Sequence, residues 1–479
     1  MSEFINRPLS RRGFLGGATV AAGLGLTACG GGQQKAAEAP SGKEGGGTIT
    51  AGTAYSTQNY DPSTTSSALA LGVNWQVVEG LYGLNFHDYS TFNELATADP
   101  KKVDDYTFEI TLRDGAKFSD GNEVKADDVV ESFNRSAAKG SVYVPMLSPI
   151  ASVEKKDDKT VTVKTTIANF SLLKERLSIV RVVPASSSQD EMKKQPFGSG
   201  PWQFESISDN TLDLVPNKNY NGATPAKDDK LHYDVLKDPT ARLTAQQDGT
   251  TLAMEMVPAD AVDQLKGAGC TVDAVQGFGV RFAMFNLGKA PWDNVKVRQA
   301  CLYALDTDKM LANAFSGQAE VATSYLPSSF ANYHKASTVY AHDVDKAKKL
   351  IAESGITPGD VVLRTTDNEQ VKSMATQVKN DLDALGFNVS IVSDTSPATY
   401  AAIDAVDGSW DILLAPGDPS CFGADVDLLL NWWYGDNVWM TKRCPWKESD
   451  EWTKLHNLMT KALGQSGADQ QSTWNACFD

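Results

Sequence analysis

The feature that constrains the fold most is an alternation of strand-like and helix-like segments between residues 361 and 415. Three apolar stretches, VVLRT (Val361–Thr365), NVSIV (Asn388–Val392) and WDILLA (Trp410–Ala415), are separated by two helical stretches. In the first of these, Glu369–Gly386, apolar residues recur every three or four positions, as on one face of a helix; the second is YAAIDAVD, Tyr400–Asp407. A β-α-β-α-β order predicts a largely parallel sheet with crossover helices, and therefore an α/β fold.

The chain before residue 290 has a different pattern, with short segments in which apolar and polar residues alternate. In TFEITLRDG (Thr107–Gly115), Phe108, Ile110 and Leu112 fall on one face, which predicts a half-buried strand that ends in a turn. Because 479 residues are too many for one hydrophobic core, we expect two or three domains.

The N-terminus has the layout of an export signal. SRRGFL (Ser10–Leu15) places two arginines before an apolar run that ends at LTAC, Leu26–Cys29, as in signals of the twin-arginine type. LTAC resembles the lipobox of bacterial lipoproteins, so we predict a signal peptide at 1–28, lipidation of Cys29 and a flexible tether at 29–47. An uncleaved anchor or a chance apolar terminus is the alternative. The predicted location is the outer face of the cytoplasmic membrane, through the lipid anchor.

Composition excludes some classes of function. The formal net charge is −16 and no basic stripe occurs, which argues against nucleic-acid binding. The six cysteines form no CxxC pair, so no zinc site is predicted. Because export permits disulfides, we predict a bond between Cys421 and Cys444, and we expect Cys301 to lie in the core.

The stretch DILLAPGDPSCFGADVDLLLNWWYG, Asp411–Gly435, is the best candidate for a site. It starts as the last predicted strand and continues into carboxylates and an aromatic cluster. In open α/β sheets, ligands bind beyond the carboxyl ends of the strands. A metal, a sugar and the amine end of a peptide are all compatible with these residue types. Asp425 and Asp427 are interpreted as charges at a helix start, with a metal pair as the weaker alternative.

Two long segments resemble the signature of the family 5 extracellular solute-binding proteins, the oligopeptide, dipeptide and nickel receptors of ABC importers. These are LRDGAKFSDGNEVKADDVVESFNR (Leu112–Arg135) and FNLGKAPWDNVKVRQACLYALDTDKML (Phe285–Leu311). PFGSGPWQF (Pro196–Phe204) matches as well. The chain departs from the family at Lys125, which stands where the family has a Ser or Thr helix cap; Asp127 and Asp128 in the first helical turn compensate in part.

The resemblance implies a periplasmic-binding-protein-like type II fold, a bilobal clamp of the three-domain (cluster C) variant. Domain I is then expected at 48–85 and 197–285, domain II at 86–196 and domain III at 286–479. The chain ends with NACFD inside a predicted helix, so we expect the C-terminal part of domain I to be missing. The implied partners are a solute and the permease and ATPase subunits of an importer, with the receptor itself a monomer.

The resemblance also implies ligand-binding residues. Peptide-binding members hold the ligand's α-ammonium with an aspartate after a domain III strand, and Asp418 is the matching residue; an Asx turn before Pro419 is the alternative. We predict that one of Trp432 and Trp433 lines the pocket while the other is packed. Tyr55, after the first strand, lies where family members touch the ligand from domain I, although it is equally compatible with a turn.

Several other functions remain open at this point. No HExxH, GxSxG, GxxxxGK[ST] or EF-hand motif occurs, so an enzyme is not predicted, and neither is a cofactor or a resident metal. The favoured function is capture of peptides for import. A receptor for oligosaccharides, a receptor for nickel and a sensory lipoprotein of the same fold are the alternatives.

Overall fold

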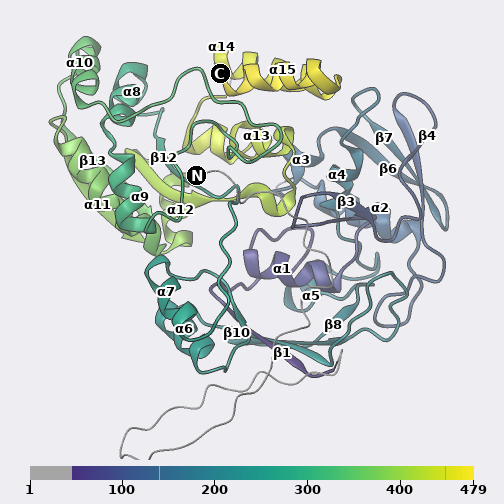
Figure 1. Cartoon of the computed structure of the whole chain (residues 1–479). Coiled ribbons are helices and arrows are strands. Elements are labelled where there is room, and N and C mark those ends of the chain that lie inside the picture. The colour runs from purple at the N-terminus through teal and green to yellow at the C-terminus, as the bar shows by residue number, and fades with distance from the viewer. Residues whose placement is uncertain (1–45, 140, 448) are drawn as a thin grey trace, which may run out of the picture. The chain divides into compact units, whose positions relative to one another are not determined.

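The computed structural model describes residues 46–139, 141–447 and 449–479 (Figure 1). Three sheets of four or five strands organise this part of the chain. The first has the order β11-β1-β10-β9-β8, in which β1 is parallel to β10 and β11, and β9 is antiparallel to both its neighbours. Its strands are β1 (Thr48–Thr53), β8 (Trp202–Ile207), β9 (Thr211–Pro216), β10 (Lys230–Val235) and β11 (Ala253–Met254). They come from the two segments expected to form domain I.

Helix α1 (Ala68–Val77) covers the first sheet. Leu69, Val73 and Val77 are buried with Trp202 and Leu214 of the sheet. The chain enters β8 through two glycines that lie directly against the end of this helix. A Cβ atom on Gly200 would be 2.5 Å from a carbonyl oxygen of α1, so the close approach requires glycine.

The second sheet is antiparallel and has the order β4-β5-β7-β6. Its strands are β4 (Lys101–Lys102), β5 (Thr107–Thr111), β6 (Ile150–Asp157) and β7 (Thr160–Thr165), with α2 (Ala126–Ser136) packed beside it and a two-stranded ribbon of β2 (Tyr82–Leu84) and β3 (Thr91–Asn93) nearby in sequence. Phe108 and Ile110 of β5 are buried, as their alternation predicted.

The Lys125 side chain does not cap α2. Instead, the Asp128 carboxylate in the first turn of this helix accepts a hydrogen bond from the Lys125 N–H at 2.8 Å.

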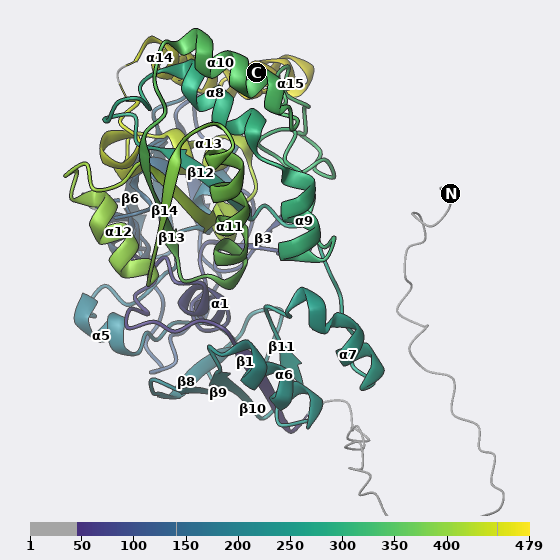
Figure 2. The same ribbon diagram turned by 90° about the vertical axis from the view of Figure 1, so that its left-hand side faces the viewer.

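The third sheet confirms the predicted β-α-β-α-β unit (Figure 2). In the order β12-β15-β13-β14, strand β13 is parallel to β14 and β15, whereas β12 is antiparallel to β15. The strands are β12 (Val280–Phe285), β13 (Asp360–Thr366), β14 (Asn388–Asp394) and β15 (Ile412–Gly417), and the crossover helices are α11 (Glu369–Asp383) and α12 (Ser396–Asp404).

Both faces of β15 are covered, which explains why its sequence is apolar at every position instead of alternating. Ile412 and Leu414 belong to the core that contains α11, together with α8 (Val295–Ala304), α9 (Thr307–Phe315) and α10 (Val344–Ser354). Leu413 and Ala415 belong to a smaller core with Ile403 of α12.

The helices that follow β15 pack with a distant part of the chain. They are η2 (Pro419–Phe422), α13 (Val426–Tyr434), η3 (Trp439–Arg443), α14 (Asp450–Leu463) and α15 (Gly467–Phe478). Buried apolar residues of η2, α13, α14 and α15 share one core with residues 81–182. The residues after β15 were expected in domain III (286–479), but they share a hydrophobic core with residues of the expected domain II.

Short helices complete the structure: α3 (Val144–Leu147), α4 (Leu173–Ser178), α5 (Gln189–Lys194), α6 (Pro239–Gln247), η1 (Ala259–Ala261) and α7 (Val262–Gly267).

A buried ion cluster joins α4 to the start of α13. Arg176 is completely buried and donates through both terminal nitrogens to Asp425 and through Nη2 to Asp427 at 2.7 Å. Asp425 also caps α13 by accepting from the Leu428 N–H at 2.9 Å. The two aspartates are therefore helix-start charges, as interpreted from the sequence, but no sequence pattern indicated their cationic partner.

The predicted disulfide between Cys421 and Cys444 is wrong, because both residues are free thiols. Cys421 lies in η2 before α13, and Cys444 follows η3 after it. Their surroundings also differ: Cys421 lines a small cavity with Tyr143, and Cys444 lies near Tyr434. Burial raises the pKa of Cys444 to about 11. Cys301 is buried in the core, as predicted.

The predicted signal, lipidation site and most of the tether lie outside the described residues. Within the described ranges, no helix is both long and apolar enough to cross a membrane.

We expect Arg176→Met to lower the free energy of unfolding by about 3–5 kcal/mol, because two carboxylates would remain in the interior without a cation. Lys174→Met, on the same helix, is the matched control. Lys174 pairs with Asp99 at the surface, and such a pair contributes at most about 1 kcal/mol. Urea unfolding of both variants measures the difference, and similar losses in the two would contradict a dominant role for the buried cluster.

The free thiols can be tested on denatured protein that has never been exposed to a reductant. We expect Cys421 and Cys444 to be alkylated by iodoacetamide as completely as Cys301, which is buried away from both in the core. Peptide mapping by mass spectrometry gives the extent at each position. Recovery of a cross-linked peptide that contains Cys421 and Cys444 would restore the disulfide.

Candidate functional site

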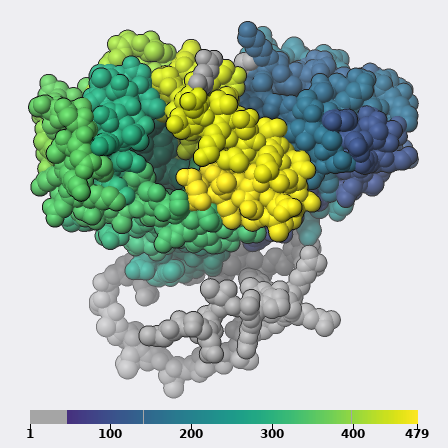
Figure 3. Space-filling view, turned by 90° about the horizontal axis from the view of Figure 1, so that it is seen from above, coloured from purple at the N-terminus to yellow at the C-terminus, as the bar shows by residue number. Residues whose placement is uncertain are grey.

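A cleft of about 2780 Å³ lies between the first and third sheets. The first sheet's side contributes the loop after β1 and residues of α6 and η1. The opposite side contributes β12, α9, the start of α11 and the end of β15, and the cleft extends to α14 and α15. Figure 3 shows the hollow between the green residues and the yellow C-terminal helices. Since closed pockets for drug-sized ligands have about 300–1,000 Å³, this volume describes an open groove.

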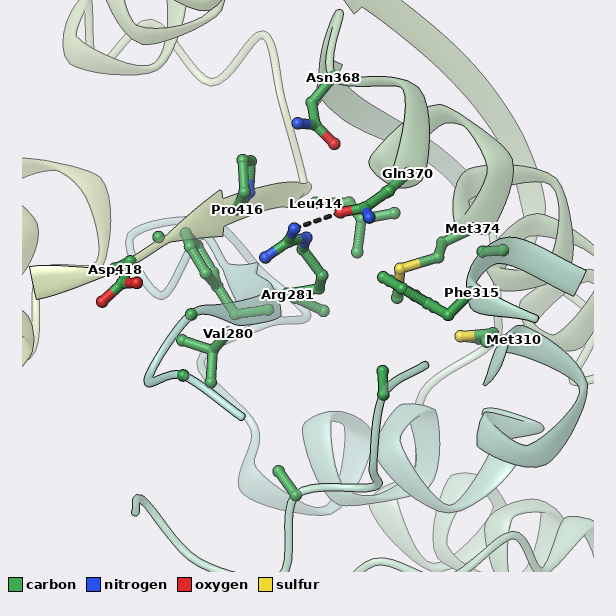
Figure 4. A pocket seen from close by; sticks show the side chains of 18 of the residues that line it. Val280, Arg281, Met310, Phe315, Asn368, Gln370, Met374, Leu414, Pro416 and Asp418 are labelled. Atoms are coloured by element: carbon green, nitrogen blue, oxygen red, sulfur yellow. Dashed lines mark hydrogen bonds between the residues drawn. The ribbon is translucent and has the colours of Figure 1, made fainter. Parts of the chain in front are cut away.

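The antiparallel pairing of β12 with β15 determines which side chains face the cleft. Arg281 is opposite Pro416, and Val280 is opposite Gly417. Because side chains alternate between the faces of a strand, Arg281, Pro416 and the following Asp418 project to the same face, the one that carries α11. Figure 4 shows Arg281 on β12 and Asp418 at the end of β15.

Asp418 lies where the sequence predicted it, at the end of β15 and exposed in the cleft. Its two carboxylate oxygens have different environments. Oδ1 accepts a hydrogen bond from the Ser420 N–H at 2.9 Å, which forms the Asx turn considered as the alternative. Oδ2 faces the empty space beside Gly279, at 3.5 Å from the position that a Cβ atom would take there. The turn and an available carboxylate oxygen therefore coexist in one residue.

Arg281 is a cleft residue that the sequence reasoning missed. One of its terminal nitrogens donates to Gln370 Oε1, at the start of α11, and its Nε is buried without a partner. The guanidinium also lies 6.0 Å from the centre of the Phe315 ring. Burial lowers the pKa of Arg281, and the nearby Tyr55 and Asp418 oppose this shift. Within the described ranges, no carboxylate lies within salt-bridge distance of Arg281. The only signal in the sequence was a single arginine inside the apolar stretch VRFAMF.

Tyr55 lines the same cleft from the side of the first sheet, so the structure brings it into one site with Asp418. Burial raises the pKa of its phenol, with Glu255 and Asp418 adding to the shift. The phenol is therefore protonated at neutral pH and offers both a donor and an acceptor. Glu255 accepts hydrogen bonds from the Thr53 hydroxyl at 2.6 Å and the Ala54 N–H at 3.1 Å, which holds the backbone that leads to Tyr55.

The prediction that a tryptophan of α13 lines the pocket is wrong. Trp432 packs on Phe422, with 5.5 Å between the ring centres, and Trp433 packs on Phe282 at 4.8 Å. Trp433 lies directly behind Gly417, where a Cβ atom would be 2.3 Å from its ring. The residue of the cluster that lines the cleft is Tyr434, which lies one helical turn after another lining residue, Leu430.

The described ranges contain no group of three or more His, Cys, Asp or Glu side chains placed to hold a metal ion. Asp418 and Arg281 are an aspartate and an arginine on one sheet face of the cleft, whose lining also includes other charged residues such as Lys237, Asp260 and Lys454. Such a pair suits organic ligands that carry both an ammonium and an anionic group.

Comparison with known proteins identifies the fold. The structure is similar to the periplasmic binding protein DppA from Helicobacter pylori in complex with peptide STSA, with a TM-score of 0.80 and 20% identity over 91% of this chain and 90% of that one. Similar folds also occur in other peptide-binding proteins. The molecule thus has the type II bilobal fold of periplasmic binding proteins, as the sequence predicted.

Sequence comparison identifies the family. The heme-binding protein A of Haemophilus influenzae is 31% identical over 67% of this chain and 64% of its own length. The glutathione-binding protein GsiB of Pectobacterium atrosepticum is 27% identical over 70% of this chain and 67% of its own. The profile "Bacterial extracellular solute-binding proteins, family 5 Middle" matches residues 92–440. The chain therefore belongs to family 5 of the bacterial extracellular solute-binding proteins.

Proposed function

We propose that this chain is the extracytoplasmic receptor of an ABC importer and that it captures short peptides by their free amino end. The observation that carries the proposal is the Asp418 carboxylate. It lies in the cleft, uses one oxygen for a local turn and leaves the other without a partner among the described residues. A carboxylate in this position can accept a charge-assisted hydrogen bond from a ligand ammonium.

The open cleft supports a cycle of capture and release. Tyr55 and Asp418 approach the cleft from different sheets, and the Asp418 carboxylate adds to the rise in the pKa of Tyr55 that burial causes. Hinge closure over a ligand is an established type of domain motion. Closure would remove water from around the Asp418–ammonium pair and thereby strengthen it, because electrostatic interactions grow as the local dielectric falls.

The assignment of a peptide ligand rests on the residues of the cleft more than on the ligands of similar proteins. The names of the similar proteins mention heme, glutathione and a peptide, so membership of the family leaves the solute open. Asp418 favours an amine. A sugar receptor would be favoured by aromatic faces in the cleft; Trp432 and Trp433 do not line it, whereas Tyr434 and Trp446 do, so an oligosaccharide stays an alternative that the first experiment below tests. Nickel receptors and sensory proteins of this fold remain alternatives that the experiment below addresses.

The proposed location follows from the N-terminal sequence. A twin-arginine signal at 1–28 would export the chain, lipidation of Cys29 would anchor it, and the tether at 29–47 would hold the receptor near its permease and ATPase partners. We propose that it acts there as a monomer, as a transport receptor and not as an enzyme.

The first test is to identify what the purified protein carries. We expect native mass spectrometry of gently purified protein to show a set of adducts that denaturation releases as peptides. Hexose-spaced masses or a metal adduct would overturn the peptide assignment while leaving the transport receptor in place. The control is the same protein after unfolding, dialysis and refolding, which should carry no adduct.

The role of Asp418 is tested by Asp418→Asn, in which the amide oxygen can still accept from the Ser420 N–H. We expect binding of a free-amine peptide to weaken by about 10- to 100-fold, the equivalent of one charge-assisted hydrogen bond. The N-acetylated form of the same peptide should bind weakly to both proteins. Isothermal titration calorimetry measures both ligands.

Asp407→Asn is the matched control for this variant. Asp407 accepts a hydrogen bond from the Ser409 N–H at 2.9 Å in the same kind of turn, but it does not line the cleft. Binding should be unchanged in this control. An equal loss of affinity for free and acetylated peptides in Asp418→Asn would show that the residue shapes the loop and does not bind the amine.

A further inference from the structure

The loop that joins β2 to β3 contacts the segment that carries Asp418. Tyr89, in this loop, donates a hydrogen bond from its hydroxyl to Ser420 Oγ at 3.3 Å, although the two residues are 331 positions apart in the chain. Ser420 is buried, and its N–H donates to Asp418 Oδ1 at 2.9 Å. A chain of two hydrogen bonds thus connects the β2–β3 ribbon to the carboxylate that we propose as the ligand's partner.

The backbone of Tyr89 indicates that its side chain matters at this position. Its φ angle is +58°, in the left-handed region, which is unfavourable for a bulky residue and suits Gly or Asn. The Tyr89 N–H donates to the Asn85 carbonyl at 2.7 Å, a contact that glycine would make equally well. Backbone strain of this kind persists only where the surroundings compensate for it. The compensation at Tyr89 comes from what its ring and hydroxyl contact.

Aromatic contacts fix the direction of the Tyr89 hydroxyl. The ring meets Phe278 edge to face, with 5.2 Å between the ring centres, and Phe278 meets Phe330 in the same way at 4.8 Å. Phe86, in the same loop, lies 6.5 Å from the Tyr89 ring. Because these contacts restrict the rotation of the ring, the hydroxyl reaches Ser420 with little further loss of side-chain entropy.

The Tyr89 hydroxyl acts as a donor at neutral pH. Burial raises its pKa, the hydrogen bond with Ser420 opposes the rise, and the nearby Asp418 carboxylate adds to it. The phenol therefore stays protonated. Neither Tyr89 nor Ser420 is among the residues that line the cleft. Any contribution of Tyr89 to binding is therefore transmitted through Asp418.

We propose that Tyr89 is a positioning residue for ligand binding, which acts through Ser420 to hold the Asp418 carboxylate in place for the amino end of the ligand. This role rests on the proposed function as a peptide receptor and goes beyond it, because it gives the β2–β3 ribbon, which does not line the cleft, a part in binding. The alternative is that Tyr89 only attaches the ribbon to the rest of the fold.

The test measures how strongly each variant prefers a free amino end. A synthetic library of peptides of two to five residues is made once with free and once with acetylated amino ends, and calorimetry gives the apparent affinity for each. Tyr89→Phe keeps the ring and its packing. It should bind the free-amine library about 3- to 10-fold more weakly than the wild type, the equivalent of one neutral hydrogen bond. Its affinity for the acetylated library should be unchanged.

Two further variants test the route through Ser420. Ser420→Ala keeps the N–H that donates to Asp418 but removes the acceptor of the Tyr89 hydroxyl. It should show a loss similar to that of Tyr89→Phe, and the double variant should lose no more, because both changes break one interaction. In Asp418→Asn, which no longer offers the ammonium a charge, adding Tyr89→Phe should have no further effect.

Tyr82→Phe is the matched control. Tyr82 lies in β2 of the same ribbon, is completely buried, and donates from its hydroxyl to the Ala98 carbonyl at 3.0 Å. This variant loses a hydrogen bond of the ribbon that does not lead to Asp418, so its binding should equal that of the wild type. Thermal unfolding of each free variant separates changes in stability from changes in binding.

Wild-type affinity in Tyr89→Phe would overturn the positioning role, as would an equal loss for the free and acetylated libraries. An equal effect of Tyr89→Phe with and without the Asp418 carboxylate would do the same. These results would leave the proposed function intact. If the wild-type protein binds neither library, or binds both equally, the proposed capture of peptides by their amino end is overturned, and the role of Tyr89 with it.

Discussion

The antiparallel pairing of β12 with β15 is the contact on which the candidate site depends. It joins the strand that enters the third sheet to the last strand of that sheet, and its register places Arg281 opposite Pro416. The apolar residues enforce this register: Phe282 and Met284 pack toward α12, whereas Phe285 is buried in the core with α11. A slip of one residue would exchange these faces. It would also turn Arg281 away from the cleft, so core packing and site geometry are specified by the same hydrogen bonds.

The loop that carries Asp418 is held at both ends. Before it, β15 is buried on both faces between α11 and α12. After it, α13 starts at Asp425, which is attached to the buried Arg176. Burial raises the pKa of Asp427, and the adjacent guanidinium opposes this shift. A short segment between two fixed elements has little freedom, which keeps the Asp418 carboxylate at one place in an otherwise open cleft.

Local patterns predicted much of the fold. The helical periodicity of 369–386 and the apolar stretches around it predicted the parallel unit of the third sheet, and Asp418 followed from its place at a strand end. Tyr55 was found through the family resemblance and lies in the same cleft. The orientation of the α13 aromatics could not be predicted, because neighbouring residues of a helix point in directions about 100° apart and the apolar face was defined only by its partners.

The sequence by itself determined the class of the molecule: its α/β architecture, its family and the strand end at which the site lies. These depend on periodicity and on motifs within one segment, and both can be read from neighbouring residues. Only the tertiary structure decided which charges meet. Arg176 is 249 positions from Asp425 in the chain. Arg281 lies near Asp418 only because of the register between two distant strands. Electrostatic partners are selected by distance in space, and separation along the chain does not constrain them.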